Sequence, residues 1–166
     1  MRTKRCWVSY ARLRELFWYS KESGVFTWRT STSKKIKIGA CAGATVGHGY
    51  IHIEFDGHSY GAHRLAWFYV YGAWPQGQID HINGHRDDNR FANLRDVPRA
   101  HNLQNQRVAQ ADNVSGFLGV SKVGARFKAR IVVDGTQRQI GTFDTAEEAH
   151  EAYLRTKRQV HPGCTI

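Results

Sequence analysis

The sequence contains few cysteines, and they are widely spaced. Only three occur in 166 residues, Cys6, Cys41 and Cys164, and none forms a CxxC pair. A disulfide framework and a cysteine-bound zinc ion are not expected, because both need cysteines in paired or closely spaced sets. This usage is typical of a reducing compartment, so we expect a cytoplasmic protein.

Long apolar runs and acidic residues are also scarce. No apolar run is long enough to cross a membrane and Met1 begins no signal-peptide pattern, so no membrane partner is expected. The 24 Lys and Arg residues outnumber the 14 Asp and Glu residues, which gives a formal net charge of +10. This excess favours a polyanionic partner, above all nucleic acid. The alternative is a basic protein whose charges are only solvated.

The chain divides into segments of different character. Hydrophobic residues make up 41% of the sequence, enough for one core or two small ones. Residues 108–113 are polar and lack periodicity, so we interpret them as a linker. We therefore expect an N-terminal domain at 1–107, with its polar chemistry at about 76–107, and a second domain at 114–166.

Alternating apolar and polar residues predict strands in the N-terminal region. Tyr50 to Phe55 alternates, Asp56-Gly57 suits a hairpin turn, and a return strand is expected from His58 toward His63. Further predicted elements are a helix capped by Ser9, a strand at 25–28, and a helix at 64–71 ended by Gly72. We expect Trp18, Tyr19, Trp28 and Trp67 in the core rather than stacked on bases, because no basic alternation accompanies them.

Residues 78–106 predict a strand, a loop, a strand and a helix in that order. The strands are expected at 78–82 and 94–97, and the helix from Pro98 to about Gln106. This order can bring Asn102 on the helix back toward Asp80-His81 at the end of the first strand. Neighbours on a strand point to opposite faces, so Asp80 and His81 can serve one site only if the strand ends or distorts there.

These residue types suit the hydrolysis of a phosphodiester. His81 suits a general base because the ordinary pKa of imidazole lies near neutrality. The oxygens of Asp80 and Asn102 suit Mg²⁺ or Mn²⁺ better than zinc. Taken singly, each is an ordinary turn or surface residue. An EF-hand loop built on Asp80, Asp87 and Asp88 fails because its Gly and terminal Glu fall at the wrong offsets.

The sequence of this region resembles the HNH motif of phage-type and homing endonucleases. The segments that carry the resemblance are DHING at 80–84, DDNRFANLR at 87–95, RAHNLQN at 99–105 and, upstream, AHRLAW at 62–67. The resemblance covers about residues 50–107. It implies a ββα-metal finger that cuts DNA to leave a 5′ phosphate and a 3′ hydroxyl.

The same resemblance implies roles for single residues. His81 would be the general base, Asp80 and Asn102 would hold the divalent metal, and Asn93 would brace the loop behind His81. The sequence departs from the family pattern at His85, at Pro98 and at His101, which is an alternative metal ligand to Asn102. We read His52, His58 and His63 mainly as structural residues, and Arg64 as a candidate phosphate contact.

The C-terminal region predicts a three-stranded sheet with one packed helix. Strands are expected at 119–120, 126–133 and 137–143, with a helix after Thr145. Arg126, Lys128 and Arg130 share one strand face, and apolar residues share the other, which the helix can cover. The open cationic face suits a sheet that reads the DNA major groove, the alternative being a solvated surface.

Four C-terminal segments resemble the Apetala-two DNA-binding domain, known from plant ethylene-response factors. They are NVSGFLGVSK at 113–122, FKARI at 127–131, IGTF at 140–143 and TAEEAHEAY at 145–153. The resemblance implies a DNA-facing sheet that carries Ser121, Arg126, Lys128, Arg130 and Gln139, with Lys122 nearby. The Arg and Trp pattern that sets the target of plant members is missing, so no target sequence is implied.

Together these features predict an α+β metal-dependent endonuclease that nicks or cuts duplex DNA. The expected setting is homing or phage DNA metabolism in a phage-infected or element-carrying bacterial cell, and the expected state is a monomer or weak dimer without an evident protein partner. One alternative is a sequence-specific DNA-binding regulator with an inactive nuclease region. A structured-RNA binder or RNase is another.

Overall fold

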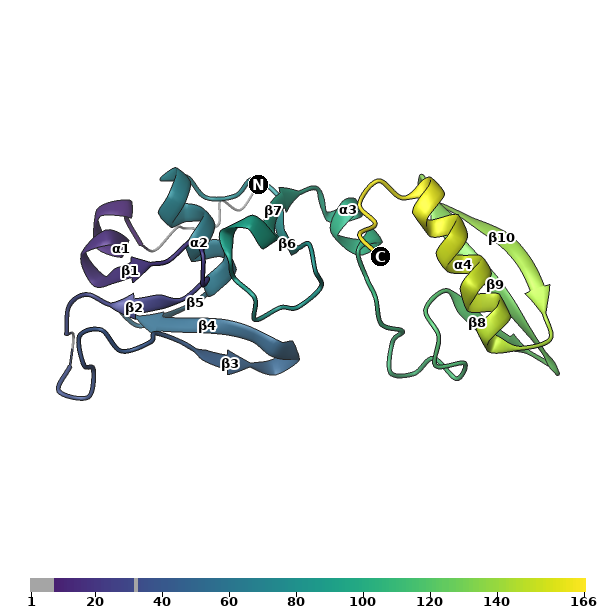
Figure 1. Ribbon diagram of the computed structural model, residues 1–166, viewed down its shortest axis with the longest axis horizontal. Helices are drawn as coiled ribbons and strands as arrows, with labels where there is room; N and C mark the ends of the chain where they lie inside the picture. The colour runs from purple at the N-terminus through teal and green to yellow at the C-terminus, as the bar shows by residue number, and fades with distance from the viewer. Residues whose placement is uncertain (1–7, 32) are drawn as a thin grey trace. The chain divides into compact units, whose positions relative to one another are not determined.

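A computed structural model describes residues 8–31 and 33–166 and shows a mixed α+β chain of two compact units (Figure 1). The units are Met1–Val97 and Pro98–Ile166, and each is described by itself. Cys6 and Met1 lie outside the described residues. None of the helices in the described part of the chain has the length and apolar composition that a membrane span requires.

The division between the units falls ten residues before the end of the predicted N-terminal domain. Residues that follow Val97 bond to the C-terminal segment: Lys157 Nζ donates to the carbonyl of Gln106, and the amide of Gly163 donates to Gln104 Oε1 at 3.0 Å. Residues 98–107 therefore pack with the second unit, and the predicted linker at 108–113 lies inside that unit.

Among its described residues, the first unit holds two helices, two 3-10 turns and three small antiparallel sheets, ordered β1-β2, β3-β4-β5 and β6-β7. Its elements are α1 (Tyr10–Leu16), β1 (Phe17–Tyr19), β2 (Phe26–Trp28), β3 (Ala44–Val46), η1 (Gly47–Gly49), β4 (Tyr50–Phe55), β5 (His58–Gly61), α2 (Ala62–Tyr71), β6 (Gln78–His81), η2 (Phe91–Asn93) and β7 (Leu94–Val97).

The predicted hairpin of β4 and β5 is present, with one difference that affects the site. Asp56 and Gly57 both have positive φ, 49° and 76°, as a tight turn between paired strands requires. However, β5 ends at Gly61 and α2 begins at Ala62. His63 therefore lies in the first turn of α2, whereas the sequence predicts it at the end of a strand.

Aromatic and aliphatic side chains from α1, β1, β2, β4 and α2 form one core. Phe17 is fully buried and its ring contacts the rings of Phe26, Trp28 and Phe55. Tyr19 and Trp28 are buried as predicted, but the prediction for Trp18 is wrong. Side chains alternate along β1, so Trp18 faces outward and is 52% exposed.

The β6-β7 hairpin presents the polar residues of the middle region. Its antiparallel register places Asp80 opposite Arg95 and His81 opposite Leu94. β6 ends at His81, which meets the condition for Asp80 and His81 to serve one site. The helix that follows, α3 (Arg99–Gln104), belongs to the second unit, so its packing against this hairpin in a ββα finger stays a prediction.

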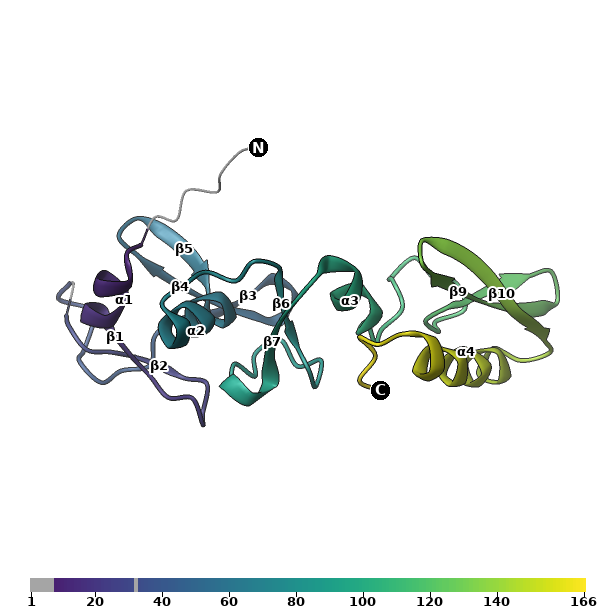
Figure 2. The same cartoon turned by 90° about the horizontal axis from the view of Figure 1, so that it is seen from above.

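The second unit contains the predicted sheet and helix. After α3 come β8 (Val120–Val123), β9 (Arg126–Val133), β10 (Thr136–Phe143) and α4 (Ala146–Val160). The strand order is β10-β9-β8, and α4 lies across one face of this sheet (Figure 2). Thr145 caps α4, because its side-chain oxygen accepts from the Glu148 amide at 3.2 Å. β9 has the predicted bounds, whereas Gly119 lies just outside β8.

Gly119 is expected to be essential to the packing of the second unit. Its φ is 77°, and a Cβ built there would lie 2.2 Å from Tyr153 Cδ2, whereas Gly116, with φ 72°, has nothing within 4 Å. Gly116→Ala should cost about 1–2 kcal/mol of stability for its left-handed backbone. Gly119→Ala should cost roughly 1–3 kcal/mol more because it also overpacks Tyr153. Urea unfolding measures both, and equal losses would contradict the packing.

Candidate active site

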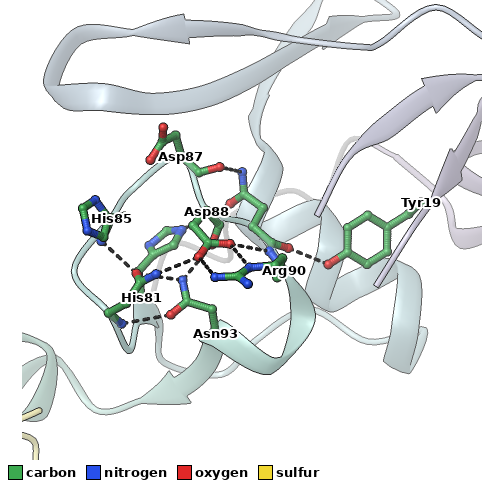
Figure 3. A network of polar contacts seen from close by, with 9 residues as sticks. Tyr19, His81, His85, Asp87, Asp88, Arg90 and Asn93 are labelled. Carbon is green, nitrogen blue, oxygen red and sulfur yellow. Dashed lines mark hydrogen bonds and ion pairs between the residues drawn. The ribbon is translucent and has the colours of Figure 1, made fainter. Parts of the chain in front are cut away.

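His81 lies at the end of β6 with only 4% of its surface exposed. Its Nε2 is 3.2 Å from Oδ1 of Asn89, a residue 1% exposed (Figure 3). The Asn89 Nδ2 donates to the carbonyl of Asp87 at 3.2 Å, so the amide turns its oxygen toward the imidazole. An amide oxygen only accepts, so Nε2 carries the proton and Nδ1 is the basic nitrogen of His81.

Asn89 is itself held by the N-terminal core. The hydroxyl of Tyr19 donates to the Asn89 carbonyl at 2.7 Å (Figure 3). Burial raises the pKa of Tyr19, so this hydroxyl keeps its proton and remains a donor. A contact from β1 thus fixes the residue that orients His81. Sequence reasoning missed Asn89, because its role depends on a tertiary contact that no spacing reveals.

Asn93 ties the two ends of the polar loop together. Its Nδ2 donates to Asn83 Oδ1 at 3.0 Å and to the Asp88 carbonyl at 2.8 Å. Its Oδ1 accepts from the main-chain N–H of Asn83 at 2.9 Å. Asp88 is also paired with Arg90, whose Nε and Nη2 donate to its two oxygens at 2.8 and 2.6 Å. This ion pair holds the pKa of Asp88 well below its usual range. The loop between β6 and β7 is therefore closed by its own side chains.

Asp80 is buried beside its cross-strand neighbour Arg95. Both Nε and Nη2 of Arg95 donate to Asp80 Oδ2, at 2.8 and 2.7 Å, and Asp80 is 5% exposed. Burying a carboxylate without a partner is costly, and this ion pair gives the Asp80 side chain a partner at that depth. The register that places the two residues opposite one another was not evident from the sequence.

His63 and Tyr50 form a ring cluster with His81. The ring of His63 lies 5.4 Å from that of His81 and 5.2 Å from that of Tyr50, centre to centre, and Tyr50 lies 6.0 Å from His81. His63 Nδ1 is buried and has no hydrogen-bond partner among the described residues. We read His63 mainly as a structural residue from its position in the sequence, and the structure places its ring beside that of the predicted base.

Burial keeps both imidazoles neutral. It lowers the pKa of His63 to about 3, and the charges of His81, Arg64 and His52 act in the same direction. Burial also lowers the pKa of His81, although the hydrogen bond that it donates to Asn89 and the charge of Asp80 act to raise it. At neutral pH His81 is therefore in the neutral form that a general base requires.

The carboxylate of Asp80 is a candidate ligand for a divalent metal ion. No three His, Cys, Asp or Glu side chains in the described ranges gather closely enough to hold a metal ion. Mg²⁺ is commonly held by one or two carboxylates, with water and substrate phosphate completing the shell. Asp80 offers such a hard oxygen ligand, which it would share with Arg95.

The other predicted site residues lie on three elements. Asn102 and His101 are half-buried on α3 in the second unit, so the expectation that one of them joins Asp80 at a metal stays a prediction. Arg64 lies on α2, with its guanidinium 5.7 Å from the ring centre of Trp74. The sheet residues predicted to bind DNA lie on β8, β9 and β10.

A buried strand-end histidine, followed by a loop that an asparagine closes, is the geometry found in residues 78–97. Residues 60–104 match the family model for HNH endonucleases. The HNH segment includes His63, Asp80, His81 and Asn93, and the match indicates a nuclease that acts on DNA. It ends before the C-terminal sheet, whose resemblance to the Apetala-two domain stays a prediction. No curated protein and no solved structure matches the chain.

Because the pKa of His63 is lowered, we expect the HNH segment to lose folding stability in acid. The folded state binds a proton at His63 only near pH 3, whereas the unfolded chain binds it near 6.5. Stability that is present above pH 6.5 should therefore be lost as the pH falls toward 3, by at most ~1.4 kcal/mol per pH unit from this group. His63→Phe keeps a ring without titrating, so its unfolding free energy should depend less on pH than that of wild type.

The matched control for this measurement is His85→Phe, which removes an exposed histidine of the same segment. Urea unfolding at several pH values between 4 and 7.5 should give the wild-type slope for this control. An unchanged slope in His63→Phe would show that His63 does not couple folding to protons.

Proposed function

We propose that the chain is a metal-dependent DNA endonuclease in which His81 is the general base. The observation that carries this proposal is the buried, neutral His81 in the HNH segment, whose Nε2 is bonded to Asn89 Oδ1, which makes Nδ1 the basic nitrogen. A base must be held in one orientation and one protonation state to take a proton from water efficiently. The surroundings of His81 supply both conditions.

In the proposed reaction, His81 Nδ1 removes a proton from a water molecule, and the resulting hydroxide oxygen bonds to phosphorus. The bond from phosphorus to the 3′ oxygen breaks, leaving a 5′ phosphate and a 3′ oxygen that is protonated from solvent. Asp80, with Asn102 or alternatively His101, would hold Mg²⁺ or Mn²⁺, which when bound stabilises charge on the phosphorane and on the leaving oxygen. Asn93 and Asn89 keep the loop and the imidazole in place.

The open face of the C-terminal sheet is the proposed DNA-binding surface. Residues opposite one another on paired strands share a face. Lys128 lies opposite Ser121 and also opposite Thr142, and Arg130 lies opposite Gln139. These polar side chains therefore line the face away from α4, where they suit phosphates and base edges.

Two of the predicted DNA-binding residues are placed differently. Lys122 lies opposite Phe127 and so faces the α4 side of the sheet, because side chains alternate along β8. Arg126 is on the open face but pairs with Asp144, Nε to Oδ1 at 2.9 Å. Ser121 is on the open face, but its hydroxyl is buried, so the proposed surface depends mainly on Lys128, Arg130 and Gln139.

One observation favours a second candidate, a DNA-binding regulator with an inactive nuclease region. The carboxylate of Asp80 is already engaged by Arg95, which competes with a cation for its charge. In that case the chain would bind duplex DNA and never cut it. Homing and phage DNA metabolism remain the proposed settings for the active enzyme, and competition between duplex DNA and RNA tests the RNA alternative.

The nuclease proposal predicts metal-dependent nicking that needs His81. Wild type incubated with supercoiled plasmid and Mg²⁺ or Mn²⁺ should produce open circles, and EDTA should abolish this. His81→Ala should lower the rate by about 10²–10⁴-fold, the usual worth of a general base, while plasmid binding persists. The measurement is the rate of conversion on agarose gels.

His85→Ala is the control for this experiment, because His85 is an exposed histidine of the same loop. It should cut at nearly the wild-type rate. Full cutting by His81→Ala would exclude His81 as the base. Tight binding without cutting in any divalent metal would favour the regulator.

The sheet proposal predicts a change in the salt dependence of DNA binding. Changing both Lys128 and Arg130 to Gln should reduce the slope of log affinity against log salt by about two, because two phosphate contacts are lost. The control changes both Arg155 and Arg158 on α4 to Gln. This variant loses the same charge at a place outside the sheet, so its salt slope should equal that of wild type. Equal effects would show that only net charge matters.

A further inference from the structure

The loop between β6 and β7 carries two arginines that differ in their partners. Arg90 is neutralised by Asp88, with both carboxylate oxygens engaged. Arg86 forms no ion pair with any carboxylate in the part of the chain that the structure describes. Its Nη1 instead donates to the carbonyl of His48 at 3.0 Å.

Arg86 is nevertheless held in place. Its guanidinium carbon lies 5.1 Å from the ring centre of Tyr50, and the bond to His48 fixes it against the turn before β4. An aromatic ring carries no net charge, so a guanidinium that lies over it is not neutralised. Arg86 is therefore an exposed, positioned cation whose charge is not cancelled by a protein anion.

Tyr50 places this cation next to the candidate active site. The ring that lies against Arg86 also contacts the rings of His63 and His81, at 5.2 and 6.0 Å. The same ring cluster contains the buried, unpartnered Nδ1 of His63. A positive group that shares the Tyr50 ring as a neighbour with the proposed base suits a phosphate of the cut strand, since Arg binds phosphate through a fork of N–H donors.

We propose that Arg86, held on Tyr50, binds a backbone phosphate of the DNA strand that His81 cuts. This rests on the proposed function for its substrate, duplex DNA. Arg86 would set the register of the strand at the site, and Tyr50 would act as a positioning residue through Arg86. Contacts to phosphate position a nuclease without reading sequence, so the subsite serves any duplex target.

Arg29 provides a closely matched control within the same unit. It too is an exposed arginine that donates to a main-chain carbonyl, from Nη1 to Arg14 at 3.1 Å, and lies over an aromatic ring, Trp18 at 4.4 Å. Its contacts are to α1 and β1 rather than to the ring cluster of the site. R86Q and R29Q therefore remove the same charge, the same kind of hydrogen bond and the same kind of ring contact.

The test measures binding of the full chain to duplex DNA in EDTA over a series of salt concentrations. R86Q should reduce the salt slope by about one and weaken binding near 0.1 M salt roughly tenfold, while R29Q leaves the slope unchanged. R86K retains the charge and should retain the slope. Equal slopes for R86Q and wild type, or equal losses in R86Q and R29Q, would overturn the proposal.

A second measurement locates the contact. Duplexes in which one phosphate near the cut is replaced by an uncharged methylphosphonate should weaken wild type at one position and leave R86Q unaffected there. No such position would exclude the phosphate contact. Because binding needs no cutting, a chain that never cleaves but shows this pattern would retain the Arg86 subsite and lose only the nuclease proposal.

Discussion

The candidate site depends on one constraint, the closure of a polar loop by its own amides. The loop between β6 and β7 has only the short η2 turn as regular structure, so the side chains of Asn93 and Asn83 bond part of its main chain. Buried polar groups need hydrogen-bond partners, and a buried group that loses its partner keeps the full free-energy cost of its desolvation. Closure of this loop and the hydrogen bond from Tyr19 together keep Asn89 buried and within reach of His81.

Burial of His81 then has an electrostatic consequence. A histidine in water is partly protonated near neutral pH, and a protonated imidazole cannot act as a base. Packing against His63 and Tyr50 removes water from around the ring and penalises its charged form. Burial desolvates His63 as well and lowers its pKa. The ring cluster therefore keeps the base neutral, but the fold loses stability in acid.

The sequence could predict what local periodicity determines. Strands β4, β7 and β9 have the predicted bounds, because alternation, turn residues and length all agree there. The strands β1 and β3 are only three residues long and were not predicted, since such short pieces are defined by their pairing partners. The spacing of residues along the chain also indicated Asp80, His81 and Asn93. It did not indicate Asn89 or Arg95. Asn89 reaches His81 only once the loop closes, and Arg95 reaches Asp80 only once the strands adopt their register.

Charge in the loop shows why position matters more than composition. Arg86, Asp87, Asp88 and Arg90 sum to zero, so composition alone predicts no attraction for DNA. Asp88 accepts from Asn83 and pairs with Arg90, which directs that carboxylate into the loop and cancels the Arg90 charge. Arg86 instead lies over the ring of Tyr50, a member of the ring cluster, and donates a hydrogen bond to the His48 carbonyl. A loop of no net charge can thus hold a cation against the Tyr50 ring of the cluster, because its hydrogen bonds decide which arginine is neutralised.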